Sequence, residues 1–272
     1  MTPPADVSWR VNAERLVVLS WLRAILLQLA HPLVAAGVAE HSTFRGGASA
    51  ALSRLHQTVG AMLAITFGDD EACERALEGI RVIHRRVHGS LREPCGGYPA
   101  GTPYSAEDPG LLLWVHATLI DSVVRVYGEL VAPLAGADRD AYCADAAAAA
   151  TALGVNARDV PRSWHALQDY LDVQLASGAI QPCAQARQLA AALLAPSRAF
   201  VARPAHTLLR LIAAGLLPAD VRRGYGLEWS ARRERAFRAL MTTLRMTRRV
   251  APRRVAWWPA ARADRSGPPR RA

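Results

Sequence analysis

The stretch LVVLSWLRAILLQLAHPLVAAGVA, residues 16–39, decides the fold class of this chain. It is the most apolar segment of the 272 residues, but a membrane-spanning helix needs about 20 apolar residues in a row. Four residues interrupt the run: Arg23, Gln28, His31 and Pro32. Because the residue before a proline avoids the α region, we expect one buried helix over about residues 8–30 and a short second helix through Val38.

Helical periodicity continues along the rest of the chain, and no segment of strict alternation reaches the length of a strand. The Pro- and Gly-rich residues 90–106 predict a loop. We therefore expect an all-α fold: a single multi-helix globular domain over residues 15–249, with an N-terminal segment (1–14) before it and a basic, disordered tail (250–272) after it. Further helices are expected over residues 50–67, 69–88, 109–130, 138–153, 161–176, 183–194, 197–214 and 228–249.

The positive charge of the chain is concentrated near its C-terminal end. The net charge is +10, and residues 228–272 hold 13 Arg against 3 acidic residues, whereas residues 1–227 hold 20 of each. Such an Arg- and Trp-containing tail can make peripheral contact with anionic lipid or with nucleic acid. The alternative is a solvated tail without a partner, and we expect no specific nucleic acid partner.

The cysteines and the N-terminus both suggest a reducing environment. The N-terminus, MTPPADVSWRVNAER, lacks a basic start followed by an apolar region, so a secretory signal peptide is not expected. The four cysteines are far apart and form no CxxC motif, which argues against a zinc ribbon, a redox dithiol and covalent haem attachment. We expect reduced thiols in a cytoplasmic protein.

Two histidines lie within predicted apolar helix faces. At 100° per residue, His84 shares a face with Leu77 and Ile80, while His88 lies at the rim of that face, and His116 is in the middle of the apolar face of the 109–130 helix. A buried imidazole needs a partner for its ring nitrogens. That partner is either a carbonyl or hydroxyl group, as for an ordinary core histidine, or a metal or haem iron.

The sequence lacks the motifs of several other enzyme classes. His84 and His88 are one helical turn apart, so both can reach one ion, but HExxH, which would supply a general base, is absent. No Glu-x-x-His pair supports a di-iron bundle. Neither a GxSxG nucleophile elbow nor a nucleotide-binding glycine loop occurs.

Four blocks in this order carry a family resemblance: LLQLAHPLVAAGVAEHSTF (26–44), SRLHQTVGAMLAITFGDD (53–70), IRVIHRRVHG (80–89) and YSAEDPGLLLWVHATLIDS (104–122). Over about residues 15–225 the chain resembles the bacterial family grouped with the fungal oxygenase of mycophenolic acid biosynthesis and with the rubber oxygenase called latex clearing protein. The resemblance implies an all-helical fold with a buried pocket for one non-covalent haem b. It also implies O2-dependent cleavage of carbon–carbon double bonds in isoprenoid chains.

The same resemblance implies roles for single residues. The family's histidine motif falls on Arg81-Val82-Ile83-His84 and makes His84 the expected iron ligand. Arg54 and Thr58 match an arginine and a threonine on the distal side, where Arg54 is expected to pair with a haem propionate or with bound oxygen. The alternative for both is a helix-packing pair. Glu40 matches an upstream glutamate proposed as a base, and the alternative for Glu40 is a plain helix-terminus carboxylate.

The remaining cofactor contacts are also implied by the resemblance. His88 and His116 are expected to support the haem pocket, and the alternative for His116 is a core histidine. The rubber oxygenase has a lysine just before the distal threonine, but Gln57 stands there and the chain contains no lysine. A lysine-closed resting state is therefore excluded, so the sixth position is open, filled by water or filled by a histidine.

The resulting functional expectation is a haem b-dependent oxidoreductase, an O2-using oxygenase that acts on an apolar, isoprenoid or lipid-like substrate. Because no export signal is seen, polyisoprene is not the expected substrate. The alternative is a non-catalytic haem- or lipid-binding protein on the same fold.

Overall fold

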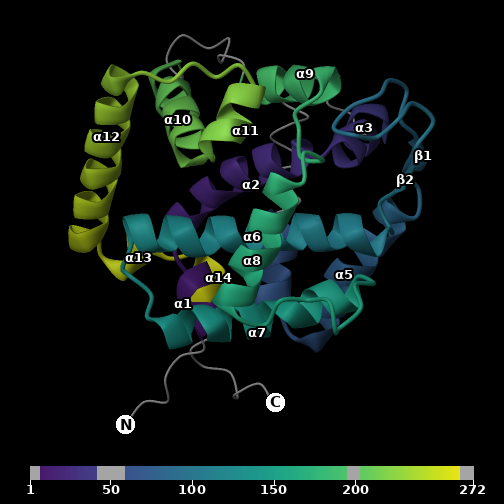
Figure 1. The fold of residues 1–272 in the computed structure, drawn as a ribbon. Helices are drawn as coiled ribbons and strands as arrows, with labels where there is room; N and C mark the ends of the chain where they lie inside the picture. Colours follow the sequence, from purple (N-terminus) through teal and green to yellow (C-terminus); the bar gives the residue numbers. More distant parts are fainter. Residues whose placement is uncertain (1–6, 42–58, 195–202, 264–272) are drawn as a thin grey trace.

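The computed structural model describes residues 7–41, 59–194 and 203–263, and it confirms the all-α class (Figure 1). The first half contains α1 (Val7–Asn12), the 3-10 helix η1 (Arg15–Val18), α2 (Leu19–Leu29), α3 (Pro32–His41), a helical stretch over residues 59–67, and α5 (Asp70–His84). A hairpin of β1 (His88–Ser90) and β2 (Pro103–Ser105) follows. The second half contains α6 (Pro109–Leu130), α7 (Gly136–Ala152), α8 (Trp164–Ala176), α9 (Ala184–Leu193), α10 (Arg203–Leu216), α11 (Ala219–Gly224), α12 (Ala231–Val250), α13 (Arg253–Ala256) and α14 (Pro259–Ala263).

Helix α6 is the central element, and α2 packs along it (Figure 1). Asp108 caps the start of α6, because its carboxylate accepts hydrogen bonds from the backbone N–H groups of Gly110 and Leu111 at 2.8 and 3.0 Å. Pro109 occupies the first turn, where a missing N–H costs nothing. This start agrees with the prediction. Unlike an amphipathic surface helix, however, α6 is buried on nearly all sides, and its buried residues include Trp114, Asp121 and Val126.

Length and composition alone would allow α6 to span a membrane, and the same test is passed by the pair Arg15–Leu29 and Pro32–His41 taken together. That pair is bent by 105° at the break before Pro32. Of the apolar window in α6, 72% is buried inside the protein, as in the core helix of a globular fold. Burial against other helices therefore accounts for the apolarity of α6.

The break between α2 and α3 lies where His31-Pro32 predicts it. The backbone N–H of Leu33 donates a hydrogen bond to Nδ1 of His31 at 3.3 Å, so the imidazole caps the start of α3. Since Nδ1 is an acceptor, Nε2 carries the hydrogen and faces the hydroxyl of Tyr98 at 3.4 Å. The role of His31 is thus explained by helix capping and a hydrogen bond.

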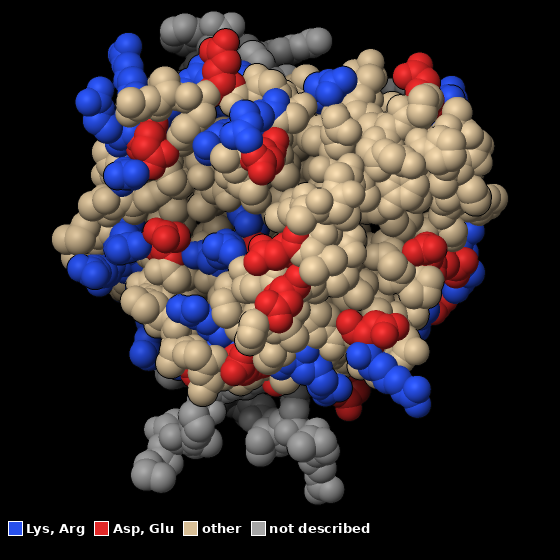
Figure 2. Space-filling view, in the orientation of Figure 1, with Lys and Arg blue, Asp and Glu red and all other residues tan. Residues whose placement is uncertain are grey.

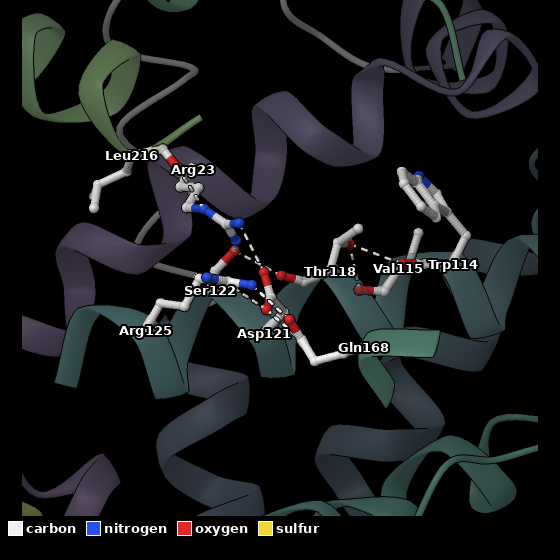
Figure 3. A network of polar contacts seen from close by, with 9 residues as sticks. All are labelled: Arg23, Trp114, Val115, Thr118, Asp121, Ser122, Arg125, Gln168 and Leu216. Carbon is white, nitrogen blue, oxygen red and sulfur yellow. Dashed lines mark hydrogen bonds and ion pairs between the residues drawn. The ribbon is translucent and has the colours of Figure 1, made fainter. Parts of the chain in front are cut away.

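A buried polar network joins α2, α6, α8 and α10 (Figure 3). Arg23 and Asp121 form an ion pair at 2.7 Å, and their side chains are only 4% and 2% exposed. Arg23 also donates to the hydroxyl of Ser122 and to the carbonyl of Leu216, while Gln168 donates to Asp121 at 2.9 Å. The arginine that interrupts the apolar run of α2 is therefore fully paired, which makes its burial tolerable.

A second buried carboxylate ties the two ends of the described chain together. Glu14, which is 3% exposed, accepts hydrogen bonds from both Nε and Nη2 of Arg248 and from Nε1 of Trp257. Trp257 and Ala256 pack in one cluster with Ala13 and Phe67. The described part of the expected tail, residues 250–263, is therefore folded rather than disordered, and the rest of that tail lies outside the described residues.

Replacing Glu14 with alanine is expected to lower the free energy of unfolding by about 2–4 kcal/mol, because the guanidinium of Arg248 and the indole N–H of Trp257 lose their buried acceptor. The control is Glu129→Ala, which removes the partner of Arg245 on the same helix α12, at the surface. That change is expected to cost less than about 1 kcal/mol. Urea unfolding of both variants is the measurement, and equal losses would contradict the role given to Glu14.

Besides the end of α5, which is described with the site, two boundaries differ from the predictions. The expected helix over residues 8–30 is divided into α1, η1 and α2, with Ala13 and Glu14 between α1 and η1. The expected loop over residues 90–106 contains part of the hairpin, in which Gly89 pairs with Tyr104. These three-residue strands are too short to show alternation, which explains why periodicity did not predict them.

Candidate functional site

Helix α5 places His84 at its C-terminal end. Asp69 caps the start of α5 by accepting a hydrogen bond from the N–H of Ala72 at 2.8 Å. Near the other end, the guanidinium of Arg81 donates to the carbonyl of Ala152 at the end of α7. The predicted face of α5 is its less exposed side, since Leu77 is buried and Ile80 and His84 are half-buried.

The imidazole of His84 is held in its neutral form. Burial lowers the pKa of His84 from its ordinary value, and the nearby carboxylate of Glu107 opposes this only partly. No hydrogen bond from the His84 ring to another side chain or carbonyl is found among the described residues. A neutral imidazole has one ring nitrogen with an available lone pair, and this is the form that binds iron.

The predicted position of His88 at the rim of the same helix is wrong. Helix α5 ends at His84. The chain then turns, and the backbone N–H of Val87 donates a hydrogen bond to the carbonyl of His84 at 2.9 Å. His88 is an exposed residue at the start of β1. The backbone carbonyl of His88 accepts a hydrogen bond from Nε2 of His41 at 3.0 Å. His84 and His88 are therefore not one helical turn apart, and the helical basis for a shared metal ion is lost.

His116 lies on α6 and is half-buried. Burial lowers its pKa to about 4, so the ring is neutral at physiological pH. Among the described residues, no hydrogen-bond partner of the ring is found. His116 thus resembles His84 in protonation state, as expected for a residue that supports an apolar pocket, although the core-histidine alternative is equally consistent with its burial.

Glu40 lies near the end of α3 and is tied to the hairpin. Its carboxylate accepts one hydrogen bond from the hydroxyl of Tyr104 and one from Nε of Arg92, both at 2.8 Å. The hydrogen bond from Tyr104, followed by that from Arg92, lowers the pKa of Glu40, so this side chain is ionised. The sequence offered no spacing that would have identified Tyr104 and Arg92 as its partners.

The hairpin makes this arrangement possible through a close contact at Gly89. A Cβ at this position would lie 2.6 Å from the hydroxyl oxygen of Tyr104, too close for any other residue. The ring of Tyr104 packs with Leu33 and Leu91 and against Val87. The end of α3, the turn after His84 and the hairpin are thereby joined in one cluster.

Arg54, Thr58 and Gln57 lie outside the described residues. The stretch that follows them, residues 59–67, is helical, in agreement with the predicted 50–67 helix. Phe67 is buried against Trp9, with their ring centroids 6.0 Å apart. The roles of Arg54 and Thr58 stay predictions.

The described residues fit haem b in the chemistry of their donors. No group of three or more His, Cys, Asp or Glu side chains that would hold a bare metal ion occurs within residues 7–41, 59–194 and 203–263. Haem needs only an axial ligand from the protein, because the porphyrin supplies the equatorial nitrogens. Burial lowers the pKa of both His84 and His116, which favours their neutral imidazoles, and Ile80, one turn before His84, is only half-buried by the protein itself.

A cavity of about 670 Å³ lies elsewhere, between the hairpin loop and the start of α9. It is lined by Tyr98 and by Cys95 and Cys183, whose thiols both donate to the carbonyl of Gln181, at 3.6 and 3.8 Å. Neither His84 nor His116 lines this cavity. Because the two cysteines are far apart in the chain, no motif predicted that they meet.

The buried His31 next to this cavity predicts a pH dependence of stability. Burial lowers its pKa to about 4, against 6.5 for an ordinary histidine, so the unfolded chain binds a proton that the folded chain does not. Stability from this residue is complete above about pH 6.5 and is lost as the pH falls towards 4, by about 3 kcal/mol.

The variant His31→Asn keeps an N-cap acceptor but has no titrating ring. We expect it to lose about 3 kcal/mol less stability than the original chain between pH 6.5 and 4. Urea unfolding at a series of pH values is the measurement. The control His165→Asn removes an imidazole that is 86% exposed and should leave the pH dependence unchanged; a His31→Asn profile parallel to the original one would refute the assignment.

Three comparisons with known proteins bear on the site. Residues 9–246 match the family model described as "ER-bound oxygenase mpaB/B'/Rubber oxygenase, catalytic domain". Two relatives, the uncharacterized proteins Mb2261 of Mycobacterium bovis and Rv2237 of Mycobacterium tuberculosis, are each 30% identical over 238 residues, which covers 86% of this chain and 89% of the relative. No solved structure matches the chain.

Proposed function

Since the chain belongs to the family of ER-bound oxygenase mpaB/B' and rubber oxygenase catalytic domains, we propose that it is a haem b-dependent oxygenase that uses O2 to oxidise a small apolar substrate of isoprenoid or lipid-like character. Membership implies an enzyme of the oxygenase type that acts on a small molecule. The observation that supports the haem proposal is the position of His84, half-buried at the end of α5 in the Arg81-Val82-Ile83-His84 motif, where burial lowers its pKa.

In this proposal His84 holds the cofactor through one ring nitrogen, and His116 contributes a second neutral imidazole to the pocket. When bound, haem supplies the iron at which O2 is activated. The protein orients the substrate and keeps water away from it, for which the apolar face of α5, with Leu77 and Ile80, is suited. Arg54 and Thr58, which lie outside the described residues, are proposed from the family resemblance to donate hydrogen bonds in the same pocket.

Glu40 is proposed as a proton acceptor, and its contacts set a condition on that role. While Tyr104 and Arg92 both donate to its carboxylate, its lowered pKa makes it a weak base. Proton uptake at Glu40 is therefore less favourable while both hydrogen bonds are in place, and loss of either one would raise its pKa.

The proposed function is tested by incubating the haem-loaded protein with squalene and shorter isoprenoid alkenes under ¹⁸O2, with and without a reductant. The expected result is oxygen uptake with ¹⁸O in a carbonyl product. Haem binding without oxygen uptake across the panel would contradict an oxygenase and favour the alternative of a haem- or lipid-binding protein. The His88→Ala variant is the matched control, because an exposed hairpin residue should not change turnover.

A further inference from the structure

The end of α12 and the short helix α13 expose apolar side chains that do not pack into the hydrophobic core. Met246, Val250 and Val255 are 53%, 82% and 57% exposed. The opposite side of α12 packs inward, with Met241 buried beside Leu130 in a cluster joined by α6 and α10. The helix therefore has a second apolar surface, separate from the one that holds it to the protein.

Arginines surround these side chains. From residue 235 to residue 263 the chain has no acidic residue and eight arginines: 235, 238, 245, 248, 249, 253, 254 and 262. Three of the eight are paired, with Glu234, Glu129 and Glu14. Arg249, Arg253 and Arg254 form no ion pair with the part of the chain that the structure describes, and Figure 2 shows basic side chains along the edge that α12 forms in Figure 1.

The arginines and the apolar side chains form one surface rather than two. Met246, Arg249 and Val250 are three and four residues apart on one face of α12, and Nη1 of Arg249 contacts Sδ of Met246 at 3.8 Å. The guanidinium of Arg253 lies 4.9 Å above the ring of Trp257, which is buried and thereby holds α13 on the protein. The basic-apolar patch comprises Met246, Arg249, Val250, Arg253, Arg254 and Val255.

We propose that the basic-apolar patch binds the surface of a lipid bilayer that contains anionic headgroups. Arginines attract the headgroups, while protruding aliphatic side chains enter the boundary between headgroups and acyl chains. Nucleic acid fits less well, because exposed valines gain nothing from a phosphate backbone and the tryptophans next to the patch, Trp257 and Trp258, pack into the cluster with Ala13 and Phe67. The proposal does not depend on haem, although a protein held at a membrane would meet apolar substrates dissolved there.

The test is co-sedimentation of the full chain with vesicles of phosphatidylcholine alone and of equal parts phosphatidylcholine and phosphatidylglycerol. Binding is expected only to the anionic vesicles and is expected to weaken as salt is raised. The triple variant Arg249→Gln/Arg253→Gln/Arg254→Gln is expected to lower the partition coefficient about 100-fold. The double variant Val250→Asp/Val255→Asp is expected to lower it at least about tenfold.

Two control variants keep the result interpretable. The controls change exposed residues that are far from the patch in sequence: one is Arg158→Gln/Arg162→Gln and the other is Val173→Asp. Both should bind anionic vesicles like the original chain. Circular dichroism melts establish that each variant is folded. Unchanged binding of the folded patch variants would overturn the proposal. Binding of the original chain to a DNA duplex would also overturn the proposal, if the arginine variant lost that binding and the Val250→Asp/Val255→Asp variant kept it.

Discussion

Replacing Asp121 with alanine is expected to destabilise the protein by about 3–5 kcal/mol, because the guanidinium of Arg23 would stay buried without its counter-charge. Burial alone would raise the pKa of Asp121, but the charges of Arg23 and Arg125 and the hydrogen bond from Gln168 hold this pKa below its ordinary value. Ionised Asp121 thus joins α6 to α2 and α8 (Figure 3). The measurement is the free energy of unfolding in urea at pH 7.

Two further variants show whether this loss comes from an unpaired charge. In Arg23→Met/Asp121→Leu both charges are replaced by apolar side chains, and much of the lost stability is expected to return. Glu71→Ala removes the partner of Arg75 in a surface pair whose side chains are 80% and 63% exposed, and it should cost less than about 1 kcal/mol. If Asp121→Ala were as mild as Glu71→Ala, the buried network would have little to do with holding the central helices together.

Replacing His84 with alanine is expected to abolish stable haem binding, with a loss of affinity of at least about 100-fold, since the proposed axial ligand is removed. The measurement is the Soret absorbance and the iron content after gel filtration of protein supplied with haem. His84→Gly with added imidazole should recover the absorbance, because the free ring can occupy the space of the lost one.

The matched control is His88→Ala, in the same HRRVH sequence. His88 is exposed on β1, so this variant should keep the haem band. If the Soret band remained in His84→Ala and disappeared in His116→Ala, the iron ligand would lie on α6 instead. The two histidines of one short motif thus have opposite expected outcomes, although the helical wheel placed His84 within one apolar face and His88 at its rim.

The difference between His84 and His88 shows what periodicity can predict. The apolar face of α5 follows from local spacing, and Leu77 and Ile80 lie on its inner side as expected. The end of α5 does not follow from local spacing, because neither Gly nor Pro stands at residues 85–87. Just past this end, Val87 packs against the cluster that contains Tyr104 and Leu33, a contact between distant parts of the chain that local spacing does not show.

Helix caps could be predicted from the sequence more easily than hydrogen-bond partners from distant parts of the chain. Asp108 at the start of α6 and the break at Pro32 involve only neighbouring residues, so the sequence alone was sufficient. The donors to Glu40 and the meeting of Cys95 with Cys183 depend on where the hairpin lies against α3 and α9. Residues 250–272 were predicted to be a disordered tail, because composition does not show that Trp257 donates a hydrogen bond to the distant Glu14.

Whether this chain binds haem b through His84 is decided by the absorption spectrum of the purified protein in its ferric and ferrous states, after expression with a haem precursor. We expect a Soret band, a pyridine haemochrome of the b type and bound iron in proportion to protein, all of which disappear in His84→Ala. A folded protein that contains no iron and shows no Soret band after haem supplementation would refute haem binding by this chain.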